Sequence, residues 1–175
     1  DLLEVVQKIS TLAKFSYVRQ PVPLGDGHAI LQAAHLVDDD ESVLIIFGDC
    51  IYDSVVPASK QMIEAYEQYH TPIIGLAEVA KEDVSKFGVV GGEKINELDF
   101  RITHIVEKPT PDNAPSRLVA AGKYIITHDV FETLSTLEMG KSGEIRLADA
   151  FDIILEKKMP MYGRMLQGEW LDTGD

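Results

Sequence analysis

Apolar residues along the chain form two alternating patterns, short continuous runs and stripes with helical spacing. Residues 43–47 and 73–79 are continuous apolar runs, typical of strands buried on both faces, as in parallel sheets. Residues 30–37 instead repeat apolar side chains at i, i+3, i+4 and i+7, which predicts a helix. Together these patterns predict strands at 15–18, 43–47, 73–79, 87–90, 102–106, 118–127 and 161–166, and helices within 2–12, 30–37, 57–69, 131–137 and 147–155.

Helices that alternate with apolar strands indicate an α/β domain with a mostly parallel sheet. The 175 residues suit one domain and are long enough to bury a core. In open α/β sheets, ligands bind beyond the carboxyl ends of the strands. Candidate chemistry is therefore expected where an apolar strand gives way to a polar turn.

Charge and cysteine content limit the partners and the compartment. The formal net charge is −13, so the chain should repel DNA, RNA and anionic membrane surfaces, and we expect neither as a partner. An anionic substrate would need a metal ion or local Lys and Arg. Cys50 is the single cysteine, and no apolar run approaches the roughly 18 residues of a membrane span. A reducing compartment, the cytoplasm, is expected.

Two aspartates follow short apolar segments and precede turns. Asp49 comes after the strand 43–47 and a glycine, and Asp172 comes just before Thr173-Gly174. Each could equally cap a turn, and a lone Asp such as Asp172 does so more often. As a pair at strand ends, they could share one divalent ion such as Mg²⁺.

Three further segments bring glycines or charges to strand ends. The turn Gly25-Asp26-Gly27-His28 precedes a helix and could approach a phosphate or a flat ligand, although two glycines alone are a weak signal. Glu107 and Lys108 end a strand before Pro109, a pattern that on its own favours a solvated edge pair. Gly88, inside a strand, is explained equally well by ligand approach and by packing.

The order of these motifs resembles bacterial UTP–glucose-1-phosphate uridylyltransferases, of the sugar nucleotidylyltransferase family. Each motif alone is moderately specific, whereas the ordered set is specific and covers essentially the whole chain. The resemblance rests on Arg19-Gln20, Gly25-Asp26-Gly27-His28-Ala29, Phe47-Gly48-Asp49, Phe87-Gly88-Val89-Val90, Val106-Glu107-Lys108-Pro109, Gly122-Lys123-Tyr124, Glu144-Ile145-Arg146-Leu147-Ala148-Asp149-Ala150 and Leu171-Asp172.

The resemblance implies a Rossmann-like nucleotidyltransferase domain with a mixed, mostly parallel central sheet flanked by helices. It also implies transfer of a uridylyl group from UTP to glucose 1-phosphate by Mg²⁺-assisted in-line attack, giving UDP-glucose and pyrophosphate. Residues 1–175 would form part of that domain, because the chain starts without Met and lacks the family's N-terminal nucleotide-binding segment and C-terminal region. We expect these residues alone to be inactive, and the resemblance admits a homo-oligomer.

The resemblance also assigns roles to individual residues. Asp49, Lys108 and Asp172 would be catalytic, with Asp49 and Asp172 holding Mg²⁺ and Lys108 binding the sugar phosphate. The substrate-binding residues would be Gln20 and Gly25 at the uracil base, Gly88 and Glu107 at the glucose hydroxyls, and Gly122 in the sugar pocket. Asp26 and Ala148 depart from the commonest family pattern. Two alternatives remain: a thymidylyl- or cytidylyltransferase of the same family, and a catalytically silent paralogue that binds nucleotide sugars.

Overall fold

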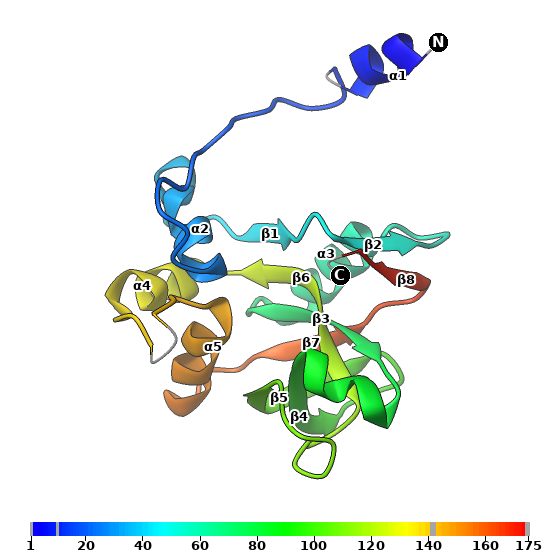
Figure 1. The fold of residues 1–175 in the computed structure, drawn as a ribbon, viewed down its shortest axis with the longest axis vertical. Coiled ribbons are helices and arrows are strands. Elements are labelled where there is room, and N and C mark those ends of the chain that lie inside the picture. Colours follow the sequence, from blue (N-terminus) through cyan, green and yellow to red (C-terminus); the bar gives the residue numbers. More distant parts are fainter. Residues whose placement is uncertain (1, 10, 141–142, 174–175) are drawn as a thin grey trace.

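The computed structural model describes residues 2–9, 11–140 and 143–173, except for the side chains of Leu2 and Asp172. Groups of one to three helices alternate with groups of one to three strands along this length (Figure 1). The helices are α1 (Leu2–Ile9), α2 (Asp26–Gln32), α3 (Ala58–Tyr69), α4 (His128–Thr136) and α5 (Leu147–Glu156), with 3₁₀ helices η1 (Ala34–Leu36) and η2 (Lys81–Lys86). The strands are β1 (Val43–Ile46), β2 (Cys50–Asp53), β3 (Ile73–Glu78), β4 (Gly88–Lys94), β5 (Asp99–Glu107), β6 (Leu118–Ile126), β7 (Tyr162–Met165) and β8 (Glu169–Asp172).

Six strands form a mixed sheet in the order β1-β6-β3-β7-β5-β4, so the expected mixed α/β sheet is present. The expectation of a mostly parallel sheet was wrong for the described residues. Only β3 and β7 pair in parallel there, and the other ladders are antiparallel. A continuous apolar run reports burial on both faces of a strand, and antiparallel strands covered by helices on both faces produce the same run.

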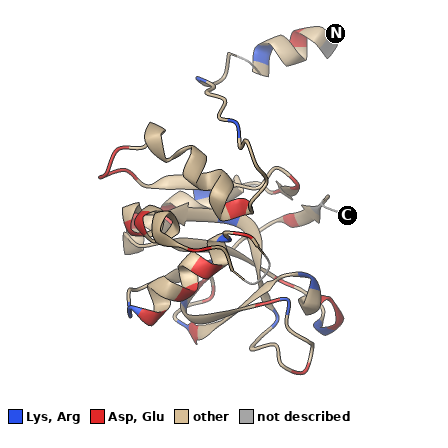
Figure 2. Ribbon diagram, turned by 60° about the vertical axis from the view of Figure 1, so that its left-hand side comes forward, with Lys and Arg blue, Asp and Glu red and all other residues tan. Residues whose placement is uncertain are grey.

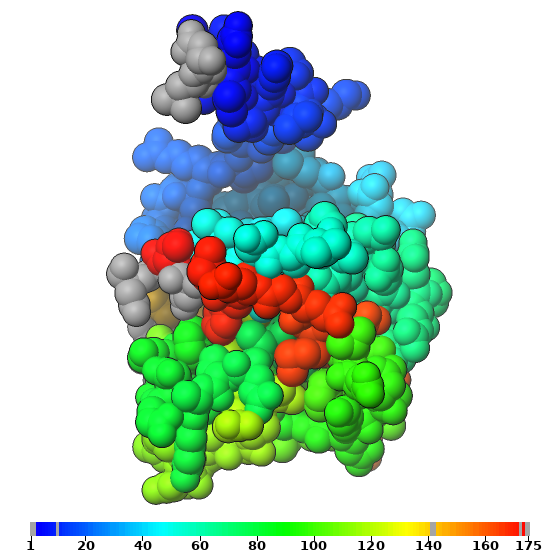
Figure 3. All heavy atoms as spheres, turned by 90° about the vertical axis from the view of Figure 1, so that its right-hand side faces the viewer, coloured from blue at the N-terminus to red at the C-terminus, as the bar shows by residue number. Residues whose placement is uncertain are grey.

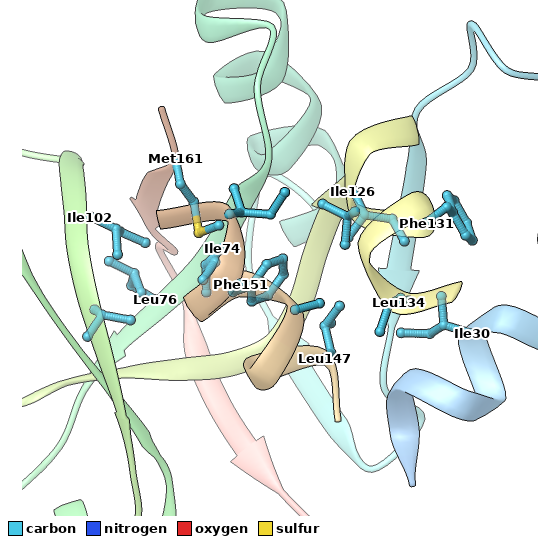
Figure 4. Close-up of a cluster of buried hydrophobic side chains, with 14 residues drawn as sticks. Ile30, Ile74, Leu76, Ile102, Ile126, Phe131, Leu134, Leu147, Phe151 and Met161 are labelled. Atoms are coloured by element: carbon cyan, nitrogen blue, oxygen red, sulfur yellow. The ribbon is translucent and has the colours of Figure 1, made fainter. Parts of the chain in front are cut away.

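Helices cover both faces of the central strands, and alternate residues of β3 show the division. Ile74 and Leu76 point into a core shared with α2, α4 and α5, where Phe151 is 1% exposed (Figure 4). Ile73 and Ala77 point to the other face, where they pack with Met62 of α3. Because strand residues alternate between faces, both cores need apolar side chains at successive positions. This explains the unbroken apolar run that predicted β3.

Two predicted strands differ from the structure. Residues 15–18 form no strand, and Tyr17 is 93% exposed, because no described segment pairs with this stretch. The strand predicted at 43–47 exists as β1, but it is only half-buried rather than buried on both faces. It lies at the sheet edge, where β6 is its one partner among the described strands.

Beside the main sheet, β2 and β8 form a separate two-stranded antiparallel ribbon. In the space-filling view, the orange-red segment that contains β8 crosses the face between cyan and green parts of the chain (Figure 3). Gln61 of α3 anchors the turn before β8, because its amide donates to the Gln167 carbonyl and its Oε1 accepts from the Gln167 N–H. These two hydrogen bonds thus fix the start of β8 to helix α3, next to the main sheet.

The outer surface carries mixed charges. Acidic and basic residues are interspersed over the helices, strands and loops of the described chain (Figure 2). No long basic stripe is visible among them in this view of Figure 2. Helix α1 stands apart from the sheet at the end of an extended segment (Figure 1). No helix among the described residues is long and apolar enough to cross a bilayer.

Candidate active site

A cavity of about 630 Å³ opens where the main sheet meets the β2–β8 ribbon. This volume is in the range of small-molecule sites. Its walls come from the turn between β1 and β2, the ends of β4 and β5, the middle of β6, helix α5 and strand β8. Five of the residues singled out from the sequence line this cavity, namely Asp49, Gly88, Glu107, Lys108 and Gly122. Segments far apart in the sequence therefore converge on one site.

The remaining three predicted residues are placed differently. Gln20 and Gly25 do not line the cavity, but Asp26, which follows Gly25, does. The backbone of Asp172 pairs with Cys50, next to Asp49, whereas the Asp172 side chain lies outside the described atoms. The sharing of one divalent ion by the two carboxylates therefore stays a prediction.

Gly122 brings β6 into close contact with the start of β2. Its φ is +66°, and a Cβ at this position would lie 2.4 Å from the Cys50 Sγ. The Phe47 N–H donates to the Gly122 carbonyl at 2.8 Å. An L side chain would face both backbone strain and a collision here. Glycine therefore allows the turn that carries Asp49 to lie directly on β6.

Asp49 is exposed, and its backbone carbonyl is held by Thr173, the residue that follows β8. The Thr173 N–H and Oγ1 both donate to this carbonyl at 2.9 Å. Since Cys50 lies opposite Asp172 in the same ladder, the backbones of Asp49 and Asp172 are close neighbours. The ribbon thus brings together two aspartates that are 123 positions apart in the sequence.

Lys123 supports this turn from the opposite side of β6. Its side chain is 5% exposed, and Nζ donates to the Cys50 carbonyl at 2.7 Å and lies 4.9 Å from the centre of the Tyr52 ring. Burial lowers the pKa of Lys123, and the nearby charges of Cys50 and Asp49 oppose that shift. This cation lies behind the proposed metal-binding turn and ties it to the sheet. Its place beside Gly122 was the one feature of the sequence that pointed to this role.

Glu107 and Lys108 face the same cavity despite being neighbours at a strand end. Lys108 has a left-handed φ of 45°, and its N–H donates to the Phe87 carbonyl at 3.0 Å. Non-glycine residues in this region are uncommon and are associated with functional sites. The backbone therefore turns at Lys108, and both residues of this exposed pair line the cavity.

The partners of these two side chains differ. A Cβ on Gly88 would lie 3.1 Å from the Glu107 Oε2, so glycine makes room for this carboxylate. Lys108 has no ion pair among the described residues and is exposed to the cavity. Since the other cavity cation, Lys86, pairs with Asp83 at 2.9 Å, Lys108 is the cation best placed to meet an anionic ligand.

Asp26 joins the glycine turn to the start of α5, a link that sequence reasoning missed. Its Oδ1 accepts from the N–H groups of Gly27 at 2.7 Å and Leu147 at 3.1 Å. The Ile145 N–H also donates to the Leu24 carbonyl at 2.7 Å. In the sequence, the feature that could have indicated this link was an acidic residue between two glycines near the start of a helix. The turn and α5 therefore form one wall of the site.

Acidic neighbours also shape the chemistry of the cavity wall. Burial raises the pKa of Tyr124, and Asp26, Cys50 and Glu107 raise it further, so its hydroxyl stays protonated. Arg146 donates to both carboxylate oxygens of Asp149, at 3.1 and 2.7 Å, and these bonds raise its pKa. Tyr124 is thus a neutral group in the lining, whose charged residues are Asp26, Asp49, Asp83, Lys86, Glu107 and Lys108.

Comparisons with known proteins agree with this geometry. The chain is 37% identical over all 175 residues to a UTP–glucose-1-phosphate uridylyltransferase of Bacillus subtilis (strain 168), of which it covers 58%. It is also 37% identical over 175 residues to UTP–glucose-1-phosphate uridylyltransferase 2 of Staphylococcus saprophyticus, of which it covers 60%. The chain therefore spans about three fifths of the length of these curated relatives.

The fold is shared as well. A crystal structure of UDP-glucose pyrophosphorylase complexed with UDP-glucose matches with a TM-score of 0.91 and 36% identity, over 99% of this chain and 66% of that one. This match confirms the expected nucleotidyltransferase fold. Residues 2–175 also match the family described as nucleotidyl transferase. Because that match covers nearly the whole chain, the protein belongs to the nucleotidyl transferase family.

Proposed function

We propose that the protein transfers a uridylyl group from UTP to glucose 1-phosphate, giving UDP-glucose and pyrophosphate. The observation that carries the proposal is the convergence of Asp49, Glu107 and Lys108 on one cavity that Gly88 and Gly122 also line. Relatives named for this reaction match the whole chain at 37% identity.

The chemistry needs positioning more than a strong base. The sugar phosphate is itself the nucleophile, so the protein must align it with the α-phosphorus and balance the developing charge. Lys108 binds the phosphate of glucose 1-phosphate, and Glu107 accepts hydrogen bonds from sugar hydroxyls. Gly88 and Gly122 line the sugar pocket with backbone, and their missing side chains leave room for the Glu107 carboxylate and for the start of β2. Gln20 and Gly25 contact the uracil base.

Asp49 and Asp172 are the residues that would hold Mg²⁺. The fit rests on the chemistry and placement of the donors, because carboxylate oxygens suit this ion and the ribbon sets the two backbones side by side. When bound, Mg²⁺ supplies positive charge for the triphosphate inside an acidic protein. The lone cysteine fits a reducing compartment, so we place the reaction in the cytoplasm.

The test is steady-state kinetics of a Lys108→Met variant of the full-length protein, with pyrophosphate release as the signal. A charge-assisted phosphate contact contributes roughly 1.5–3 kcal/mol, so the KM for glucose 1-phosphate should rise about 10- to 150-fold while UTP affinity changes little. Lys94→Met also removes an exposed charge, but outside the cavity, and serves as the control. Unchanged use of both substrates by Lys108→Met would reject the assignment. Equal turnover of CTP or dTTP by the unaltered protein would reject the uridylyl specificity.

A further inference from the structure

The carboxylate of Asp26 is fixed at one oxygen and open at the other. Its Oδ1 accepts from the backbone N–H groups of Gly27 at 2.7 Å and Leu147 at 3.1 Å. Its Oδ2 has no hydrogen-bond partner within the described part of the chain. Asp26 is half-buried and lines the cavity. One oxygen of this side chain is therefore left to accept a hydrogen bond from a ligand.

Backbone hydrogen bonds on both sides of Asp26 hold this carboxylate in place. The Ile145 N–H donates to the Leu24 carbonyl at 2.7 Å, and the His28 N–H donates to the Ile145 carbonyl at 3.2 Å. Together with the bond from Leu147, these contacts fasten the glycine turn to the start of α5. A side chain that the fold orients in advance loses little conformational entropy when it binds a ligand. The position of the open oxygen is therefore set before a ligand arrives.

The residues around Asp26 leave its charge without a counterion and leave space beside it. Arg146 is bound by both carboxylate oxygens of Asp149, at 3.1 and 2.7 Å, and no cation among the described residues pairs with Asp26. Burial raises the pKa of Tyr124, and Asp26 is the charged neighbour that raises it most, so the carboxylate lies near this inner residue of the lining. Ala148, the second residue of α5, lines the cavity with only a methyl group. A ligand can therefore approach this carboxylate from the cavity.

We infer that Asp26 is a specificity-determining residue whose open oxygen accepts a hydrogen bond from a sugar hydroxyl of the bound nucleotide sugar. This inference rests on the proposed function. A carboxylate repels phosphate groups, so the part of the ligand that lies here is a neutral donor. UDP-glucose carries such donors on its base and on its two sugars, and the proposed function places the base at Gln20 and Gly25, which do not line the cavity. A hydroxyl of the glucose or of the ribose is therefore the group that Asp26 binds.

The experiment measures binding of UDP-glucose and a set of its analogues to the full-length protein by calorimetry, which needs no turnover. In each analogue, fluorine replaces one hydroxyl of the glucose or of the ribose, so that a donor is lost and a weak acceptor remains. Loss of a charge-assisted hydrogen bond weakens binding about 10- to 100-fold. The unaltered protein should show a loss of this size for the analogue that is altered at the hydroxyl bound by Asp26.

Asp26→Asn identifies that hydroxyl. The carbonyl of the new amide still accepts from Gly27 and Leu147, whereas the open oxygen becomes an NH₂ donor that tolerates fluorine. For one analogue, the loss relative to UDP-glucose should therefore shrink to less than about threefold, while the losses for all other analogues stay as they were. A response at a glucose position or at a ribose position supports the inference and tells which sugar Asp26 binds. Asp129→Asn, at an exposed residue in the first turn of α4 outside the cavity, is the matched control and should change no affinity.

Three results would overturn this role of Asp26. If Asp26→Asn changes the affinity of every analogue by the same factor, the side chain only fastens the glycine turn to α5. If the variant changes none of the affinities, its open oxygen meets no hydroxyl. Equal binding of UDP-glucose and all analogues by the unaltered protein would exclude the hydrogen bond without any substitution, so the test does not depend on the folding of a variant. An unaltered protein that does not bind UDP-glucose would instead overturn the proposed function.

Discussion

Replacing Gly122 by alanine tests whether close contact between β6 and β2 builds the site. The new Cβ would lie 2.4 Å from Cys50 Sγ and 2.8 Å from Cys50 Cβ, at a backbone φ of +66°. Contacts under 3.0 Å cannot persist, and the Cys50 Cβ is fixed to the backbone of β2. The strand that follows Asp49 must therefore move away from the sheet.

The structure allows the size of this effect to be worked out. A left-handed backbone costs a non-glycine residue about 1–2 kcal/mol. Forcing extra volume into a packed region costs about 1–3 kcal/mol more. The free energy of unfolding should thus fall by about 2–5 kcal/mol. For a domain of this size, that corresponds to a drop in melting temperature of roughly 4–20 °C.

The assay is urea unfolding followed by circular dichroism, with Gly143→Ala as the matched control. Gly143 has a φ of +77°, but no described atom lies within 4 Å of its added Cβ. It therefore carries the backbone strain without the collision, and its loss should be only about 1–2 kcal/mol. Adding Cys50→Ala to Gly122→Ala removes the Sγ collision and should recover part of the loss as a coupling energy.

Two outcomes would refute this reasoning about Gly122. Equal destabilisation by Gly122→Ala and Gly143→Ala would show that backbone strain alone matters. Additive effects of Gly122→Ala and Cys50→Ala would show that the two side chains do not meet. A third readout is UDP-glucose affinity, which should fall with Gly122→Ala and stay unchanged with Gly143→Ala.

Two further predictions concern buried or crowded carboxylates. Asp99 is 3% exposed, and its Oδ1 lies 2.6 Å from the Arg164 Nε. Asp99→Asn would leave Arg164 charged and unpaired, so the free energy of unfolding, measured in urea, should fall by about 3–5 kcal/mol. A fall of less than about 1 kcal/mol would contradict this. Burial first, and then Asp149 and Glu156, raise the pKa of Asp152 above 3.8. The folded state therefore favours the protonated form, and stability is lost as pH rises through the folded pKa. Asp152→Asn should raise the melting temperature at pH 8 but not at pH 3, and an equal change at both would oppose the assignment.

Segments with long, consistent patterns were predictable from the sequence. The run at 73–79 and the helical stripe at 57–69 became β3 and α3, because both cores demand the apolar residues that form these patterns. Strand direction was not predictable, since burial on two faces does not record which way a neighbouring strand runs. Residues 15–18 have strand-like composition, but a strand also needs a partner, and none of the described segments supplies one.

A site residue could be predicted when its own side chain has the chemistry of a ligand. It was harder to predict when the residue acts by holding another residue in place. The place of Asp49 after a strand and a glycine made it a candidate, whereas Glu107 and Lys108 were identified through the family resemblance, because their pattern alone favoured a solvated edge pair. All three residues line the cavity. Lys123 and Asp26 were not assigned roles, because their partners are a backbone carbonyl and backbone N–H groups distant in the sequence. Such contacts depend on how segments pack, and no spacing along the chain encodes them.

The charge balance of the cavity links these residues to the proposed reaction. Its lining carries the carboxylates Asp26, Asp49, Asp83 and Glu107, and the cations Lys86 and Lys108. With Lys86 paired to Asp83, one free cation faces three carboxylates, so a phosphorylated ligand meets net repulsion from the described lining. In the proposed reaction, a divalent ion at Asp49 and Asp172 would offset most of this negative charge. Removing Mg²⁺ should therefore weaken binding of the anionic substrates more than removing the charge of Lys108 does. The ion carries two positive charges next to the carboxylates, whereas the lysine carries one.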